Sequence, residues 1–255
     1  MSRTAIVTGG SRGIGRAIAL RLARDGAHVV ICARGKDALA EVEQEIQRSG
    51  GATSAIALDL RLPDAPSRLV DFAVSRCRGI DIVVNNAGAT KRGEFAGLTD
   101  EDWTDGFALK FFGAVRLTRA AWRYLKASAG TVVNISGAGG RTPGPQFTIG
   151  GSVNAALLSF TKAMSDVGIK DGVQVNAVNP GIIRTGRLKL RLAQISEEEL
   201  VRASNVTRIG EPEDVANLVA YIVSPEGRFL QGALIVAIIA QLGVQRADSA
   251  LHGNQ

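Results

Sequence analysis

The stretch AIVTGGSRGIG, residues 5–15, decides the fold of this chain. It joins a short run of apolar and β-branched residues, Ala5 to Thr8, to a glycine-rich turn that opens a helix. In such a unit the glycines allow a tight turn, and the unpaired amides at the helix N-terminus bind phosphate groups. Glycine-rich turns also occur for their geometry alone. The stretch predicts the first half of a βαβ unit and favours a bound pyrophosphate.

Similar short runs alternate with helical stretches along the rest of the chain. Between the second and third runs, Leu39, Val42 and Ile46 keep helical spacing, so one face of that helix is expected to pack on the sheet. The alternation predicts an α/β fold, a doubly wound parallel sheet with helices on both faces, as a single domain over residues 1–255. The other runs expected to be strands are His28 to Cys32, Ser54 to Leu58, Ile80 to Val84, Thr131 to Ile135, Val173 to Val178 and Leu234 to Ile238.

Composition excludes several classes of protein. The chain has 255 residues and is 45% hydrophobic, which suits one domain with a large core. No apolar run reaches the ~18–20 residues of a membrane span, since glycine and glutamine interrupt residues 229–244, the nearest candidate. The N-terminus has no basic-then-apolar leader. We expect a cytoplasmic protein that neither crosses nor binds a membrane.

Charge and cysteine content exclude further classes of protein. The net charge is +6, but Lys and Arg are dispersed among acids, so a solvated surface is expected rather than a nucleic-acid site. The densest basic segment is Arg184 to Arg191. It either forms an exposed helix face or attracts an anionic substrate. Cys32 and Cys77 form no C-x-x-C pair, so we expect buried free thiols, no disulfide and no metal.

Two further motifs follow predicted strands. NNAG occupies residues 85–88, and NPGIIRT occupies residues 179–185. Both fall at the carboxyl edge of the sheet, where open α/β sheets bind ligands. Asn and Gly also favour turns for local reasons. Together with the glycine-rich turn, the motifs predict a dinucleotide site.

With these motifs the chain resembles the short-chain dehydrogenase/reductase family from end to end. The Gly-x-x-x-Gly-x-Gly spacing of residues 9–15 matches that family and differs from the Gly-x-Gly-x-x-Gly of other dinucleotide folds. The resemblance implies a Rossmann fold, oxidoreductase chemistry on a carbonyl or alcohol of a small molecule, and a homodimer or homotetramer. It assigns cofactor binding to Gly9, Ser11, Arg12, Gly13, Ile14, Gly15, Arg34, Asp59, Leu60, Asn86, Ala87, Gly88, Pro180, Gly181, Ile183 and Thr185.

Within that set the resemblance implies separate roles. Asp59 matches the family residue that contacts adenine, and Asn85 with Gly88 would line the adenosine side. The backbone of Ile183, with Thr185, would hold the carboxamide and phosphate.

The end of the second strand indicates the choice of cofactor. An acidic residue there binds the ribose 2′-hydroxyl of NAD, whereas a basic residue accepts the 2′-phosphate of NADP. This chain has Arg34 at that point, and the guanidinium groups of Arg34 and Arg12 suit a phosphate. We expect NADP(H) to be preferred over NAD(H). The alternative is that Arg34 is a solvated loop residue.

The usual catalytic residues of the family are replaced. Ordinary members use Asn, Ser, Tyr and Lys, and the flanking residues match these positions to Lys110, Gly137, Gly150 and Asn154. No other alignment restores the acid. The two tyrosines, Tyr124 and Tyr221, are expected to be packing residues in helices, and a surface role is expected for His28 and His252.

The replacements leave one ammonium and one amide in the pocket, because Asn and Lys have exchanged places. Lys110 and Asn154 are therefore the candidate catalytic residues, with Lys110 suited to proton transfer or imine chemistry. Alternatively, Lys110 pairs with an acid such as Asp105 or extends to solvent. Ser136, Thr148 and Ser152 are further candidates to bind a carbonyl or hydroxyl.

The loss of the Tyr side chain also bears on the shape of the pocket. A run of small residues is expected to enlarge the cavity by the volume of a phenol ring: Gly137, Ala138, Gly139, Gly140, Gly150 and Gly151. Alternatively, Gly139 to Pro145 form a flexible loop.

Three functions are consistent with these residues. The first is an NADP(H)-dependent oxidoreductase with a non-standard proton donor. The second is a lyase or isomerase that uses Lys110 and binds the dinucleotide without consuming it. The third is a non-catalytic nucleotide-sensing or partner subunit.

Overall fold

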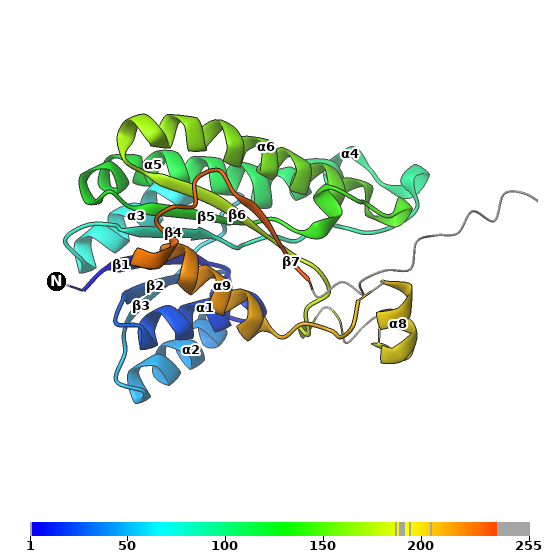
Figure 1. Ribbon diagram of the computed structural model, residues 1–255, viewed down its shortest axis with the longest axis horizontal. Coiled ribbons are helices and arrows are strands. Elements are labelled where there is room, and N and C mark those ends of the chain that lie inside the picture. Colours follow the sequence, from blue (N-terminus) through cyan, green and yellow to red (C-terminus); the bar gives the residue numbers. More distant parts are fainter. Residues whose placement is uncertain (1, 187, 189–191, 194, 205, 239–255) are drawn as a thin grey trace, which may run out of the picture.

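A parallel sheet of seven strands, in the order β3-β2-β1-β4-β5-β6-β7, runs through the centre of the molecule (Figure 1). The computed structural model describes residues 2–186, 188, 192–193, 195–204 and 206–238. Every pair of neighbouring strands is parallel. The strands are β1 (Thr4–Thr8), β2 (His28–Ala33), β3 (Ala52–Ala57), β4 (Ile82–Asn85), β5 (Thr131–Ile135), β6 (Gln174–Pro180) and β7 (Leu234–Ala237).

The sheet is covered by helices on both faces, as the alternating pattern predicted (Figure 1). On one face lie α1 (Gly13–Arg24), α2 (Lys36–Arg48) and α9 (Pro212–Val223). On the other lie α3 (Ala65–Arg76), α4 (Asp100–Phe107), α5 (Gly113–Ser128) and α6 (Thr148–Asp171). Because both faces are covered, the central strands β1, β4, β5 and β6 are buried along their whole length.

Local sequence signals explain where the helices begin and which face they bury. In α2 the expected residues Leu39, Val42 and Ile46 are the buried ones. Pro212 occupies the first turn of α9, where its missing N–H has no helical partner to lose. The N–H of Glu211 donates to the carboxylate of Asp214 over 2.8 Å, which closes a capping box there. The predicted strands and helices are confirmed with shifts of a few residues at their ends.

Several smaller expectations were wrong or fall outside the described residues. Cys32 is a buried free thiol as expected, but Cys77 is only half-buried. Tyr221 is 50% exposed and is not a core packing residue. No helix among the described residues is long and apolar enough to cross a membrane, and these residues contain no cluster that could hold a metal ion. The expectations for residues 189–191 and for His252 lie outside the described residues.

Candidate functional site

The glycine-rich turn after β1 depends on backbone shapes that favour glycine. Gly9 and Gly13 have φ angles of +67° and +53°, in the left-handed region. A Cβ on Gly15 would overlap the carbonyl oxygen of Gly9, so the first turn of α1 lies directly on the loop. The N–H of Gly9 donates to the carbonyl of Cys32 over 2.7 Å, which fixes the turn against the end of β2. The turn therefore has no room for larger residues at its closest point.

The N-terminus of α1 is the part of this turn that fits a diphosphate. The residue before the helix, Arg12, makes no side-chain cap, and the first turn contains no acidic residue. The first amides of a helix lack helical partners and carry a partial positive charge, which favours an anion. A Cβ on Gly13 would lie 3.3 Å from Cγ2 of Thr185, so the fold brings the NPGIIRT motif against the glycine-rich turn. The backbone present here fits the diphosphate of a dinucleotide.

The two asparagines of the NNAG motif make different contacts. The side chain of Asn86 donates to the carbonyl of Thr8 over 2.9 Å, and the N–H of Ala87 donates to Oγ1 of Thr8 over 3.0 Å, so both tie the motif to the end of β1. Asn85 was expected to line the adenosine side, but its side chain points into the core. Its Nδ2 donates to Oδ1 of Asn134 over 2.8 Å. Through Asn86 and Ala87, the motif thus stabilises the end of β1, where the glycine-rich turn begins.

The charged candidates for cofactor binding differ in their surroundings. Arg12 and Arg34 are both exposed, at the ends of the glycine-rich turn and of β2. Asp59 is paired with Arg61, whose Nη1 lies 3.1 Å from Oδ2 of Asp59. Arg61 also bonds Asp105, and this bond raises the pKa of Arg61. Asp105 is therefore engaged by Arg61, and the expectation that it pairs with Lys110 finds no support.

The structure brings the exchanged residues Lys110 and Asn154 into contact. Nζ of Lys110 donates to Oδ1 of Asn154 over 2.6 Å and to the carbonyl oxygen of Ser136 over 2.6 Å. Lys110 lies in a π-helical turn, Ala108–Phe112, between α4 and α5. Turns of this type are often found at functional sites. Lys110 is half-buried, whereas Asn154 is 3% exposed, so the amide forms the inner end of the pair.

Two buried polar residues lie near this pair, Ser136 just after β5 and Asn179 close to the end of β6. Oγ of Ser136 donates to the backbone carbonyl of Asn154 over 3.0 Å, which ties the end of β5 to α6. The register pairs Ile135 with Val178, so the next residues, Ser136 and Asn179, are neighbours on the same face. Asn179 is 1% exposed, and neither polar atom of its side chain has a hydrogen-bond partner among the described residues. Sequence reasoning placed Asn179 at the start of the NPGIIRT motif but gave its side chain no role, and so missed this position.

The expectation of an enlarged cavity at Gly150 was wrong. A Cβ on Gly150 would overlap the ring of Phe147, and a Cβ on Gly139 would lie 2.9 Å from the same ring. The half-buried Phe147 ring therefore fills the space that the missing side chain leaves. Core space in proteins is close-packed, so a lost side chain is commonly replaced by a neighbouring one.

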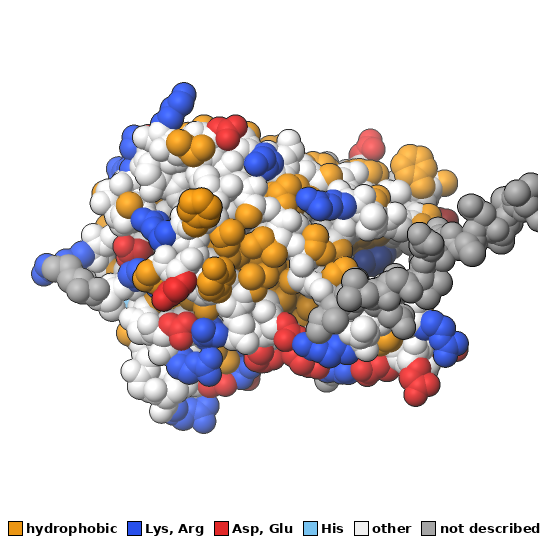
Figure 2. Space-filling view, viewed as in Figure 1, with side chains coloured by type: hydrophobic (Ala, Val, Ile, Leu, Met, Phe, Trp, Pro, Cys, Tyr) orange, Lys and Arg blue, Asp and Glu red, His pale blue; other side chains and the backbone are white. Residues whose placement is uncertain are grey.

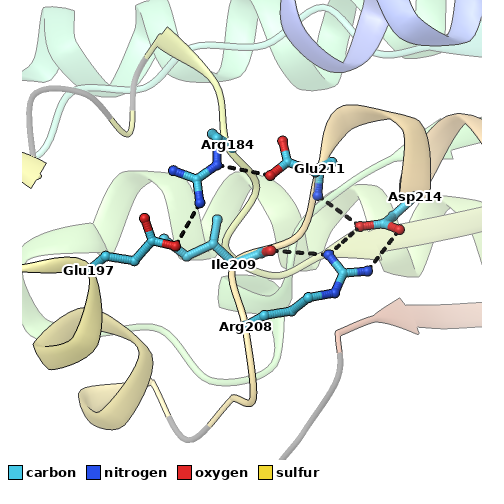
Figure 3. A network of polar contacts seen from close by, with 6 residues as sticks. All are labelled: Arg184, Glu197, Arg208, Ile209, Glu211 and Asp214. Carbon is cyan, nitrogen blue, oxygen red and sulfur yellow. Dashed lines mark hydrogen bonds and ion pairs between the residues drawn. The ribbon is translucent and has the colours of Figure 1, made fainter.

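Beside the glycine-rich turn, an ionic network holds the segment that follows β6 (Figure 3). Arg184 bonds Glu197 of α8 (Glu197–Ala203) over 2.6 Å and Glu211, the residue before α9, over 2.9 Å. Arg208 bonds Asp214 over 2.8 Å. The bond from Arg184 lowers the pKa of Glu197.

Arg184 also borders a cavity next to this network. The cavity has a volume of about 350 Å³, and Gly13 and Thr185 are among the residues that line it. Arg184 is thus exposed but engaged with two acids, as part of the wall between α8 and the glycine-rich turn.

Comparisons with known proteins agree on one family. The family model of short chain dehydrogenases matches residues 3–195. An uncharacterised oxidoreductase of Mycobacterium tuberculosis is 35% identical over 233 residues, which cover 90% of this chain and 88% of the relative. Acetoacetyl-CoA reductase of Shinella zoogloeoides is 32% identical over 241 residues, covering 93% of this chain and 97% of the relative.

A solved structure shows the same likeness in three dimensions. L-sorbose reductase from Gluconobacter frateurii, complexed with NADPH and L-sorbose, matches with a TM-score of 0.89 and 27% identity. The match covers 95% of this chain and 98% of that chain. The sheet order, the glycine-rich turn and these likenesses lead to one conclusion: the chain belongs to the short-chain dehydrogenase family, a family of oxidoreductases.

Proposed function

We propose that this protein is an NADP(H)-dependent oxidoreductase that acts on a carbonyl or alcohol group, with Lys110 in place of the usual proton donor. One observation carries the proposal: Nζ of Lys110 lies 2.6 Å from Oδ1 of Asn154 and 2.6 Å from the carbonyl of Ser136. Two acceptors hold the ammonium group at the carboxyl edge of the sheet. This is the edge where open α/β sheets bind ligands.

The cofactor assignment rests on the glycine-rich turn and two arginines. The uncapped start of α1 suits the diphosphate, and the exposed Arg12 and Arg34 suit a 2′-phosphate. L-sorbose reductase, which has a similar structure, is complexed with NADPH. When bound, NADPH would supply the hydride for reduction of a carbonyl.

The protein's own residues would manage the proton. In the direction of reduction, the ammonium of Lys110 donates a hydrogen bond to the carbonyl oxygen and transfers its proton as negative charge develops there. The neutral amine then regains a proton from solvent, to which the half-buried Lys110 has access. Asn154 and the Ser136 carbonyl orient Nζ through their 2.6 Å bonds and take no part in the proton transfer. In the direction of oxidation, the amine accepts the proton of the alcohol.

The test is a comparison of Lys110→Met with the natural protein. NADPH consumption is followed across a panel of aldehydes, ketones and oxo acids, and NADPH affinity is measured separately. We expect Lys110→Met to lose roughly 100- to 10,000-fold in kcat, the usual contribution of a general acid, with NADPH affinity retained. Lys170→Met, at an exposed position of α6, is the matched control and should behave as the natural protein. Equal turnover by Lys110→Met would overturn the assigned role.

Two other functions make different predictions for the same experiment. A lyase or isomerase would convert substrate without consuming NADPH, and an imine on Lys110 would be trapped by borohydride as a stable mass increase. A non-catalytic nucleotide-binding subunit would bind NADPH tightly and convert nothing. The ring of Phe147 beside Gly150 favours this last function, because it occupies space that a conventional proton donor would use.

A homodimer or homotetramer also forms part of the proposal. Among the described residues β7 is an edge strand, and Figure 2 shows hydrophobic side chains gathered on the face where β7 lies between α6 and α9. Exposed apolar side chains on these elements, or on the segment between α9 and β7, include Ile169, Tyr221, Phe229 and Val236. Apolar patches of this kind often mark contacts between proteins. Light scattering on the purified protein would test it, since a monomeric mass would contradict the proposal.

A further inference from the structure

The CH₂ chain of Lys110 lies directly on the backbone of Gly88, the last residue of the NNAG motif. A Cβ built on Gly88 would lie 2.8 Å from Cδ, 3.0 Å from Cγ and 3.3 Å from Cε of Lys110. Carbon atoms in favourable contact lie ~3.5–4.0 Å apart, so any larger residue at this position would overlap the lysine. The φ angle of Gly88 is not positive, so the backbone conformation does not itself require glycine. The space that Lys110 occupies is what requires it.

Both ends of this lysine side chain are held in place. Its base belongs to the π-helical turn Ala108–Phe112, which continues directly into α5. At its tip, Nζ donates to Oδ1 of Asn154 and to the carbonyl oxygen of Ser136, each over 2.6 Å. A lysine reaches such acceptors through a particular set of staggered torsions. A group that displaces the CH₂ chain at Gly88 therefore changes the torsions that bring Nζ to its two acceptors.

The same NNAG motif packs against the glycine-rich turn. A Cβ on Gly9 would lie 2.9 Å from Nδ2 of Asn86, and a Cβ on Gly15 would overlap that atom. Nδ2 of Asn86 also donates to the carbonyl of Thr8 over 2.9 Å. Asn86 and Gly88 are only two residues apart in the chain. One short backbone segment thus contacts the proposed nucleotide site at Asn86 and the CH₂ chain of Lys110 at Gly88.

We propose that Gly88 is a positioning residue for Lys110: the missing side chain at Gly88 sets where the ammonium group lies relative to the nucleotide site. A general acid must lie within hydrogen-bond reach of the atom that it protonates, and small displacements cost much of the rate. In this role Gly88 acts only through Lys110. The inference rests on the proposed function for the part of Lys110 as proton donor, but the position of Lys110 can be tested without turnover.

The test measures how fast Lys110 is acetylated in the nucleotide-free protein and in Gly88→Ala. A water-soluble acetyl ester is added at low concentration, and mass spectrometry of peptides gives the rate at each lysine. We expect Lys110 to react ~10-fold faster in Gly88→Ala, roughly the effect of losing one hydrogen bond to a charged group. Lys170, exposed on α6, is the internal reference and should react at the same rate in both proteins.

Gly93→Ala is the matched control, because Gly93 lies on the same loop after β4 and its Cβ would make an ordinary contact, 3.7 Å from Cδ2 of Leu98. It should leave the acetylation rate of Lys110 unchanged. A rate at Lys110 that does not rise in Gly88→Ala, or that rises equally in Gly93→Ala, would overturn the inference.

Thermal unfolding gives a second measurement that does not need a stable single variant. Gly88→Ala should lower the Tm of the natural protein by about 1–3 °C, because the new methyl group overlaps the CH₂ chain of Lys110. In the Lys110→Ala background that chain is gone, so adding Gly88→Ala should leave Tm nearly unchanged. An equal loss in both backgrounds would show that the two residues do not share this space and would contradict the inference.

Turnover separates this inference from the proposed function. If the natural protein reduces a carbonyl compound, Gly88→Ala should lower kcat roughly 10- to 100-fold with little change in the substrate KM. Faster acetylation of Lys110 with no turnover by either protein would support the position given to Gly88 and contradict the oxidoreductase. Turnover with the same kcat in both proteins would support the oxidoreductase and contradict the inference.

Discussion

The two halves of the sheet's carboxyl edge have changed to very different degrees. After β1, the glycine-rich turn keeps its left-handed glycines and is supported by Asn86. After β5 and at the start of α6, the resemblance predicts that Gly137, Gly150 and Asn154 stand at the family's catalytic positions. In the proposed function, the first region acts through backbone amides and the second through side-chain groups. A fold can therefore keep a binding site made of backbone while the chemistry next to it is replaced.

Packing explains why the second region tolerates such replacements. Lys110 and Asn154 still bond each other over 2.6 Å, and the ring of Phe147 fills the space at Gly150. The ammonium of Lys110 has two acceptors, and an aromatic ring lies where a side chain at Gly150 would extend. The glycine-rich turn has no comparable tolerance, because a Cβ at Gly15 would meet backbone that cannot rotate away.

The largest effect is expected from a substitution in the first region, the glycine-rich turn. In Gly15→Ala the new Cβ overlaps the Gly9 carbonyl, so the turn must move away from the start of α1. Overpacking costs roughly 1–3 kcal/mol, so we expect NADPH affinity to fall up to about 100-fold. Calorimetry measures this change. Gly79→Ala, where a Cβ meets nothing within 4 Å, should bind as the natural protein does. An unaffected Gly15→Ala would mean that the turn does not form the nucleotide site.

A second change tests whether Phe147 has replaced the lost side chain. Gly150→Tyr should lower the free energy of unfolding by roughly 1–3 kcal/mol, because the new side chain overlaps the Phe147 ring. The double variant with Phe147→Ala should recover part of that loss, since the two positions share one space. Urea denaturation measures both. Gly144→Ala, in open space on the same loop, is the control, and strict additivity of the two changes would contradict the shared space.

A third change tests whether Arg34 makes the protein prefer NADPH over NADH. Arg34→Gln should weaken NADPH binding ~10-fold and leave NADH binding nearly unchanged, because hydrogen bonds to charged groups contribute roughly 1.5–3 kcal/mol. Titration with both nucleotides measures the difference. Arg48→Gln, an exposed arginine at the end of α2, should change neither affinity. If the affinity for NADH fell as much as the affinity for NADPH, the role of Arg34 in binding the 2′-phosphate would be refuted.

The smallest effect concerns the ionic network beside the glycine-rich turn. The arginines lower the pKa values of Glu197 and Asp214, whose ordinary values are 4.5 and 3.8. A lowered pKa in the folded state stabilises it above the ordinary value, and this contribution is lost as the pH falls through the lowered value. These exposed pairs are weak, so Arg184→Gln should lower Tm by about 1–2 °C at neutral pH.

The difference in Tm between Arg184→Gln and the natural protein should shrink as the pH falls below 4.5, the ordinary pKa of Glu197, and disappear below the lowered pKa of that group. Arg228→Gln is the control, because Arg228 donates to the backbone carbonyl of Ala129 over 2.8 Å and not to an acid. Any effect of that variant should not depend on pH in this range. A difference for Arg184→Gln that persists in acid would refute the ionic origin.

Sequence patterns predicted the strands and put Lys110 and Asn154 in one pocket, but they predicted neither the bond between these two residues nor the side chains around them. The strands were predictable because a buried parallel sheet needs short apolar runs. The position of Phe147 was not, because its ring packs against residues distant in sequence, such as Arg92. The orphan amide of Asn179 was also missed, since it follows from the register between β5 and β6. The assignment of individual residues to the cofactor and the single-domain boundary stay predictions.

The sequence by itself determined the doubly wound sheet, the glycine-rich turn and the identity of the groups available for chemistry. It could do so because backbone conformation and burial leave local patterns of spacing. Only the tertiary structure decided that Lys110 faces Asn154 rather than Asp105, and that Phe147 occupies the space at Gly150. Those outcomes depend on close packing between segments that are distant in the chain, and such packing leaves no periodic signal in either segment alone.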